Sequence, residues 1–203
     1  MFGRNPWSGW GANPLPSRFE GLWAQTEGKV VGGMPYSEGI YEDMNAIIAY
    51  SHYWSDRDAN ATVHEYVAFE FSRVPAHVDA VVTAISLLEQ TWVLPAATRP
   101  PDPDQLPTYG YNYTTMLPWK RRAYELLESV DRELTPKART AWRWRMLMLR
   151  AQIDWTLSSN GGIMGVPQLC AAFDELRALQ FSSGASRVPV CPSSEWLCPL
   201  YHS

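Results

Sequence analysis

One carboxylate in this chain follows a short apolar run, at a place where enzymes often keep a reactive group. Glu38 lies in the stretch Pro35-Tyr36-Ser37-Glu38-Gly39-Ile40, just after an apolar run that ends at Met34. In parallel barrels the active residues lie on the loops that follow the strands, and Gly39 gives the backbone freedom to enter the next helix. Alternatively, Glu38 lies in the first turn of a helix from Ile40, where a carboxylate interacts favourably with the helix dipole. The local pattern leaves both interpretations open.

Aromatic and amide side chains that could bind a sugar lie in the same part of the chain. Trp7 and Trp10 belong to a stretch rich in Gly, Pro and Asn that is typical of an irregular loop, and Tyr36 comes two residues before Glu38. Exposed aromatic faces can stack on sugar rings, while Asn5 could bind hydroxyl groups. These four residues are the candidate substrate contacts. The alternative is that the rings only cover a hydrophobic core.

Other reactive side chains give no recognisable site. His52, His64 and His77 lack the spacing of metal ligands, so we expect no metal and no cofactor. Glu42 and Asp43 are expected to cap a helix or to hold a nearby positive charge. The three cysteines form neither a disulfide framework nor a zinc motif, and we expect ordinary thiols, with local pairing of Cys191 and Cys198 as the alternative.

Composition narrows the classes of partner. The 203 residues are 46% hydrophobic and 13% aromatic, which is enough to bury a substantial core. A net charge of -4 gives no basic footprint for DNA or RNA, so nucleic acid is not an expected partner. No apolar run approaches the ~20 residues that cross a bilayer, so no membrane span is expected.

The elements that would position Glu38 are a helix, a strand and then more helices. Ser17 and Glu20 form a capping-box pattern that predicts a helix ending at Gly28. The run Lys29-Val30-Val31-Gly32-Gly33-Met34 predicts a short buried strand. Apolar spacing and first-turn prolines then predict helices near residues 40–54, 60–71, 75–92, 123–134, 135–161 and 167–181, with a proline-rich connection over 96–118.

A single buried strand is informative because it cannot satisfy its own backbone groups. A (β/α)8 barrel has the same order of elements, namely helix, short apolar strand, loop and helix. The sequence therefore predicts a mainly α chain in which residues 1–39 are the truncated end of a barrel, 40–181 are a helical domain of about six helices, and 182–203 are a mobile tail. The alternative is a homodimer that pairs the strand across subunits.

The residues around Glu38 resemble one known family. The stretch Gly33-Met34-Pro35-Tyr36-Ser37-Glu38-Gly39-Ile40, followed by Tyr53-Trp54 and by Glu65-Tyr66-Val67-Ala68, is similar to the family 89 glycoside hydrolases, the α-N-acetylglucosaminidases. In that family a Gly-Met-x-Pro-Glu-Gly-Ile stretch closes the barrel and carries the catalytic nucleophile. Here two residues, Tyr36 and Ser37, separate the proline from the glutamate, which puts the substrate in question.

The resemblance implies retaining hydrolysis of a carbohydrate, with Glu38 as the nucleophile. The acid/base partner would come from the N-terminal barrel portion of the same protein, so the isolated chain is expected to be inactive. It would also imply a periplasmic, secreted or lysosome-like compartment. A second hypothesis is a non-catalytic helical module that binds a partner or a glycan, and this hypothesis predicts that the Val30-Val31 edge is covered.

Overall fold

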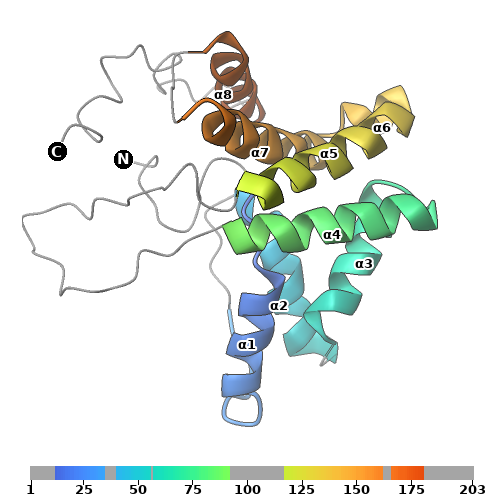
Figure 1. Ribbon diagram of the computed structural model, residues 1–203. Coiled ribbons are helices and arrows are strands. Elements are labelled where there is room, and N and C mark those ends of the chain that lie inside the picture. The colour runs from blue at the N-terminus through green and yellow to red at the C-terminus, as the bar shows by residue number, and fades with distance from the viewer. Residues whose placement is uncertain (1–11, 35–39, 56, 92–116, 162–165, 181–203) are drawn as a thin grey trace, which may run out of the picture.

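A computed structural model describes residues 12–34, 40–55, 57–91, 117–161 and 166–180 (Figure 1). The described part of the chain is helical and contains no strand. Its elements are α1 (Pro16–Thr26), the short 3-10 helix η2 (Ile40–Glu42), α2 (Asp43–Ser55), α3 (Ala59–Glu70), α4 (Pro75–Thr91), α5 (Leu117–Glu133), α6 (Pro136–Arg139), α7 (Trp142–Ser159) and α8 (Pro167–Gln180). The prediction of a mainly α chain is confirmed.

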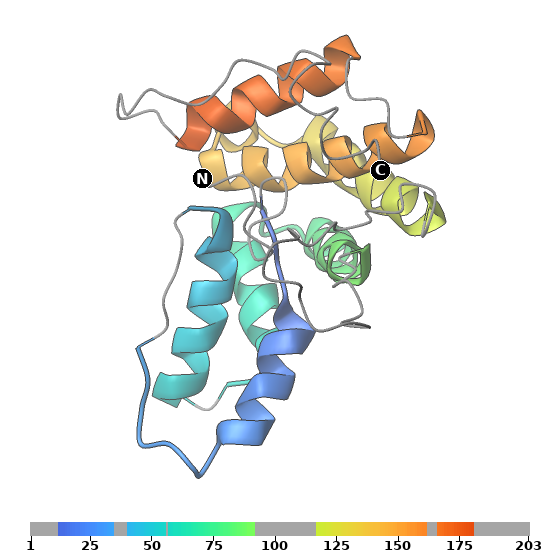
Figure 2. The ribbon, with the colours of Figure 1, turned by 90° about the vertical axis from the view of Figure 1, so that its left-hand side faces the viewer.

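The helices form two groups joined through a central pair. α1, α2 and α3 pack against one another at one end, and α7 and α8 pack together at the other (Figures 1 and 2). α4 and α5 lie side by side between the two groups, with α4 contacting α3 and α5 contacting α7. Neighbours along the chain are therefore mostly neighbours in space.

Several helix boundaries follow local signals in the sequence. Asp58 caps α3 by accepting a hydrogen bond from the Ala61 backbone N–H at 2.7 Å, and Pro75 begins α4. Thr135 caps α6 by accepting a hydrogen bond from the Ala138 backbone N–H. The predicted helix over 135–161 is nevertheless two helices, because α6 ends at Arg139 and α7 begins at Trp142.

The N-terminus of α1 corrects one prediction. Ser17 and Glu20 do not form a capping box, since Leu15 is the N-cap residue and has no side-chain cap. Instead the carboxylate of Glu89 in α4 accepts hydrogen bonds from the Ser17 and Arg18 backbone N–H groups at 3.1 and 3.0 Å. Glu20 in turn accepts from the Ala59 backbone N–H at the start of α3. Long-range partners replace the local motif, which ties α1 to two other helices.

The main hydrophobic core lies between α2, α3, α4, α5 and α7. Trp144 of α7 is fully buried, lies edge-on to Phe71 with ring centroids 5.2 Å apart, and donates its indole N–H to Asp131 at 2.7 Å. A second cluster lies between α7 and α8 and includes Leu149, Ile153 and Leu169. Burying such side chains stabilises a fold by roughly 1.5–3 kcal/mol each.

The chain before α1 is part of this core. Asn13 and Leu15 are buried, and the Asn45 side chain accepts from the Leu15 backbone N–H and donates to the Asn13 carbonyl oxygen, at 2.8 and 2.7 Å. Arg150 donates to the Ala12 carbonyl oxygen. One amide side chain thus pairs with the backbone as a neighbouring strand would. Since α1 also packs on α2 and α3, the helical body extends upstream of residue 39, where the domain boundary remains a prediction.

The predicted strand is absent. A turn over Glu27–Lys29, with Gly28 at a positive φ of 71°, leads into residues 30–34, which have no regular structure. The segment runs back alongside α2 toward η2, opposite in direction to α1 and α2 (Figure 2). Val31 and Met34 are fully exposed rather than buried. A ladder needs a neighbouring strand, and the described chain supplies none.

Candidate functional site

The five predicted site residues lie outside the described part of the chain. Glu38 and Tyr36 fall within residues 35–39, and Asn5, Trp7 and Trp10 fall within residues 1–11. The described chain ends at Met34 on one side of Glu38 and resumes at Ile40 on the other. The structure therefore describes only the two flanks of Glu38.

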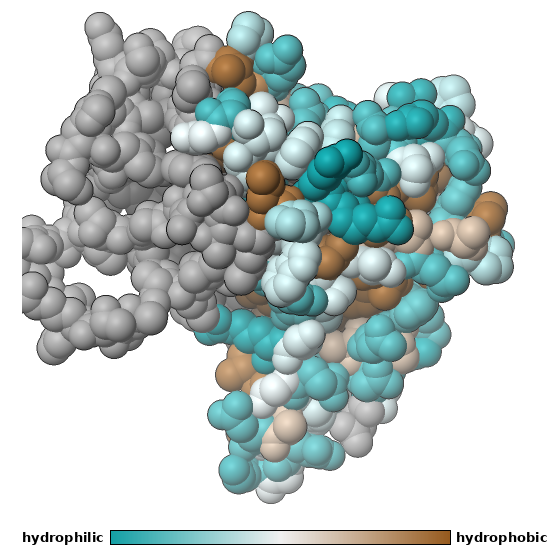
Figure 3. Space-filling model, viewed as in Figure 1, coloured by the Kyte–Doolittle hydropathy of each residue, from teal (hydrophilic) through white to brown (hydrophobic). Residues whose placement is uncertain are grey.

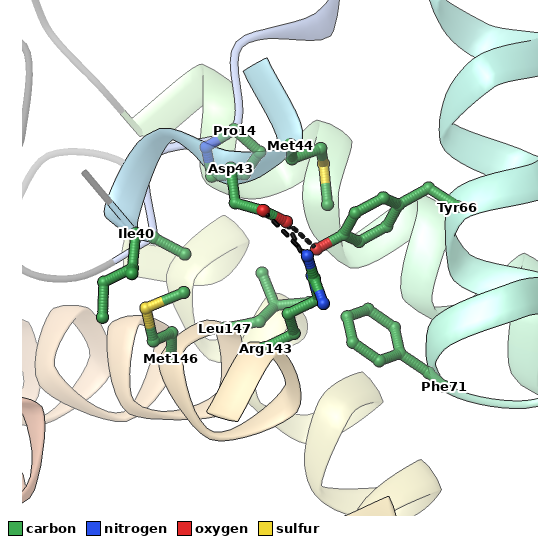
Figure 4. A pocket seen from close by; sticks show the side chains of 10 residues that line it. Pro14, Ile40, Asp43, Met44, Tyr66, Phe71, Arg143, Met146 and Leu147 are labelled. Atoms are coloured by element: carbon green, nitrogen blue, oxygen red, sulfur yellow. Dashed lines mark hydrogen bonds and ion pairs between the residues drawn. The ribbon is translucent and has the colours of Figure 1, made fainter. Parts of the chain in front are cut away.

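The flank after Glu38 is fixed by a polar network on Asp43, the first residue of α2. Arg143 of α7 binds the Asp43 carboxylate with two nitrogens, at 2.7 and 3.0 Å, and Tyr66 of α3 donates its hydroxyl to the same carboxylate at 2.9 Å (Figure 4). Arg143 also lies 3.5 Å from Glu70 and 4.2 Å from the ring centroid of Trp142. Planar two-point pairing of this kind fixes both partners in orientation.

The electrostatics of this network keep Arg143 charged and Tyr66 protonated. Hydrogen bonding to Asp43 raises the pKa of Arg143, so the guanidinium stays charged. Burial, followed by the nearby Asp43 charge, raises the pKa of the Tyr66 hydroxyl. Tyr66 therefore remains a hydrogen-bond donor. Asp43 binds a nearby positive charge, that of Arg143, as predicted.

A small cavity lies beside the network. It measures about 20 Å³ and is lined by Ile40, Asp43, Tyr66 and Arg143 together with apolar side chains such as Met146 (Figure 4). This volume accepts a group of about the size of one water molecule, and a sugar ring does not fit. The cavity lies among the side chains that hold the start of α2, and it is too small to be a substrate site by itself.

A second polar cluster lies deeper, between α4, α5 and α7. The Arg150 and Asp154 side chains are almost fully buried and pair at 2.8 Å, and Thr91 donates to Asp154 at 3.4 Å. Lys120 is also buried, and its burial lowers the pKa of its ammonium group. Lys120 and Arg150 therefore lie buried between helices and not on a solvated helix face.

His77 and His52 contact different structural partners and do not share a site. His77 donates from Nε2 to the Glu133 carboxylate and pairs through Nδ1 with the Ser72 hydroxyl, each at 2.9 Å, which links α4 to α5. His52 is buried, stacks on Trp23, and lies 3.7 Å from Glu20. Among the described residues, no group of three or more His, Cys, Asp or Glu side chains is arranged to hold a metal ion.

One cysteine prediction is wrong. Cys170 of α8 is disulfide-bonded, whereas the sequence analysis expects ordinary thiols for all three cysteines. Cys191 and Cys198 lie outside the described residues. A covalent link from α8 adds a constraint on the unfolded chain that spacing alone did not reveal.

Comparisons of this chain with protein-family models, with curated proteins and with solved structures found no match. In the described part of the chain, no helix is long and apolar enough to cross a membrane.

Proposed function

We propose that this chain is the C-terminal, helical part of a retaining glycoside hydrolase, with Glu38 as the nucleophile. The observation that carries the proposal is the uncovered stretch Val30–Met34 directly before Glu38, in which Val31 and Met34 are fully exposed. A self-sufficient helical module would be expected to cover this edge. An enzyme whose barrel continues from this segment would leave it open in the present chain.

The path of the chain supports the same proposal. α1 runs in one direction, residues 27–34 return, and α2 runs in the first direction again (Figure 2). In a barrel of alternating strands and helices, each strand likewise runs opposite to the helices beside it. Glu38 would then lie between a strand end and a helix start that Asp43 and Arg143 hold in place.

The proposed chemistry uses two carboxyl groups. The Glu38 carboxylate attacks the anomeric carbon while an acid on another part of the enzyme protonates the leaving oxygen, and water then hydrolyses the covalent intermediate. The two groups would lie about 5–5.5 Å apart. Trp7, Trp10, Tyr36 and Asn5 would contact the sugar, for which N-acetylglucosaminides are the first class to test.

The test traps the covalent intermediate on the natural gene product that contains this chain. A fluorinated N-acetylglucosaminide with a good leaving group is added, and the labelled peptide is identified by mass spectrometry. The proposal expects a label on Glu38, its loss in Glu38→Gln, and its retention in the control Glu27→Gln, which changes an exposed turn residue. Normal turnover by Glu38→Gln would exclude Glu38 as the nucleophile.

A non-catalytic helical binding module is the second candidate. Its support is the core of the described helices, which closes around Trp144, Val67 and Ile85 with no sheet. The two candidates differ in one respect that can be measured. The module would keep its binding when Glu38 is changed to Gln, and no glycoside would label it covalently.

A further inference from the structure

Apolar side chains gather at one end of the described chain, around the turn after α1. Seven of the ten large hydrophobic residues that are exposed in the described part lie between residues 22 and 54. We call them the apolar end: Leu22, Val30, Val31, Met34, Tyr50, Tyr53 and Trp54. Over α4 and α5, Figure 3 shows hydrophobic and hydrophilic residues mixed on the surface. Clustered exposed apolar groups of this kind mark interaction surfaces.

The backbone at this end is also open. Within the described part of the chain, the backbone N–H and C=O groups of residues 30–34 make no hydrogen bond, the last one before them being from Lys29 N–H to the Thr26 carbonyl. No charged residue and no proline interrupts residues 30–34. Soluble proteins usually protect exposed edges with charges, prolines or bulges. This segment has none of these protections, so its free backbone groups favour pairing with another strand.

The segment is held against the helices while its edge stays open. A Cβ atom built on Gly33 would lie 2.4 Å from the Tyr53 ring, so the backbone of residue 33 passes directly over α2. Tyr53 in turn packs edge-on against Trp23 of α1, with ring centroids 5.4 Å apart. The segment therefore lies on a layer formed by α1 and α2, as a strand lies on the helices that cover a sheet.

The direction and composition of the segment indicate which kind of sheet would pair with it. The segment runs opposite to α1 and α2, which is the relation between strand and helix in parallel α/β sheets (Figure 2). Val30 and Val31 are adjacent, and adjacent side chains of a strand face opposite sides. Apolar residues on both faces are typical of strands in parallel sheets, which are covered on both sides.

We infer that residues 30–34 add as a strand to the open edge of a parallel β-sheet, and that the rest of the apolar end packs beside that sheet. This inference rests on the proposed function, because the sheet would be the barrel that carries the acid/base. A second copy of this chain would provide only one more strand, and a two-stranded ribbon is marginally stable. A sheet of three or more strands is the occupant that the observations favour.

The test uses the purified 203-residue chain and a peptide that imitates a sheet edge. The peptide is a six-residue Val/Thr strand with alternate backbone nitrogens methylated, so that only one of its edges can form hydrogen bonds. We expect amide chemical-shift changes confined to residues 30–34 and their neighbours on α2. Amide exchange at residues 30–34 should slow by about tenfold at saturating peptide.

Two variants make the test specific. Val31→Pro removes one backbone donor at a fully exposed position and should abolish peptide binding without unfolding the chain. Phe69→Ser removes another exposed apolar residue, in α3 and outside the apolar end, and should leave binding unchanged. Equal loss in both variants would contradict a strand-type contact.

Three other outcomes would overturn the inference. They are an absence of change at residues 30–34 at millimolar peptide, amides of residues 30–34 that are already protected in the chain alone, and sedimentation showing that two copies pair through this segment. The nucleophile proposal fails separately, because Glu38→Gln should remove glycoside labelling and leave peptide binding intact.

Discussion

The two ends of the described helical body differ in whether their side chains are buried and paired or exposed. Near α7, the Arg150 and Asp154 charges are buried and paired, and the Trp144 indole N–H has its acceptor in Asp131. Near the turn after α1, Val31 and Trp54 are exposed and the backbone of residues 30–34 is open. The charges near α7 are therefore buried and paired, whereas the apolar side chains near the turn after α1 are exposed.

The largest expected effect on stability comes from breaking the buried ion pair between Arg150 and Asp154. Asp154→Ala removes one partner of a pair whose side chains are 2% and 1% exposed, and should lower the free energy of unfolding by about 3–5 kcal/mol. The reason is that the Arg150 charge is left buried without its carboxylate. Urea denaturation followed by tryptophan fluorescence measures the change.

The matched control is an exposed pair with the same spacing. Arg121 and Glu125 pair at 2.7 Å in α5, but their side chains are 63% and 44% exposed. Glu125→Ala should cost only about 0–1 kcal/mol. If both variants lost the same stability, burial would not be what distinguishes the two pairs.

The next effect concerns the Asp43 network and depends on pH. The ordinary pKa of a tyrosine hydroxyl is 10.0, and the unfolded chain loses the Tyr66 proton near that pH. Because the pKa of Tyr66 is raised in the folded protein, the folded protein keeps this hydroxyl proton above pH 10.0. Stability from this group is thus fully present below pH 10 and is lost as the pH rises further. Tyr66→Phe should cost about 1.5–3 kcal/mol at pH 7 and should flatten the decline above pH 10.

Denaturation of both proteins at pH 7 and pH 10.5 measures this difference. Tyr124→Phe is a useful comparison, because burial also raises the pKa of Tyr124, whose hydroxyl donates to Glu128 at 3.2 Å. An identical alkaline decline in the parent protein and in Tyr66→Phe would contradict the role given to the Tyr66 hydroxyl.

The smallest effect compares two glycines at the open end. Gly21 lies in α1 with nothing within 4 Å of an added Cβ, so Gly21→Ala should stabilise the chain by about 0.5–1 kcal/mol. Gly33→Ala should displace the Tyr53 ring, which meets the new methyl group, and should change stability by less than about 0.5 kcal/mol. Ring proton shifts of Tyr53 and thermal unfolding measure the two responses. Unmoved Tyr53 resonances in Gly33→Ala would show that residue 33 does not lie on α2.

The sequence predicted those elements whose signals are local. The prolines at positions 75, 136 and 167 begin helices through short-range backbone chemistry, and apolar spacing indicates the helix faces. The Ser17 and Glu20 motif failed because Glu89, 72 residues from Ser17, supplies the acceptor instead. A long-range partner leaves no trace in a window of four residues.

The polar sites show the same limit. Arg150 and Asp154 have the spacing of an ordinary surface ion pair, and only the packing of α4 and α5 makes them buried. Asp43 and Arg143 are 100 residues apart, so no motif joins them. The apolar run before Glu38 was read as a buried strand because Val30 and Val31 favour that structure, yet a pattern cannot show whether a neighbouring strand is present.

Amide hydrogen exchange of the purified chain tests the contrast between the two ends most directly. The account predicts that the amides of Val30–Met34 exchange within about tenfold of unstructured rates, while those of Leu147–Asp154 in α7 exchange only by global unfolding. Protection of residues 30–34 at the level of α7 would show that this end is already covered, and would contradict the account.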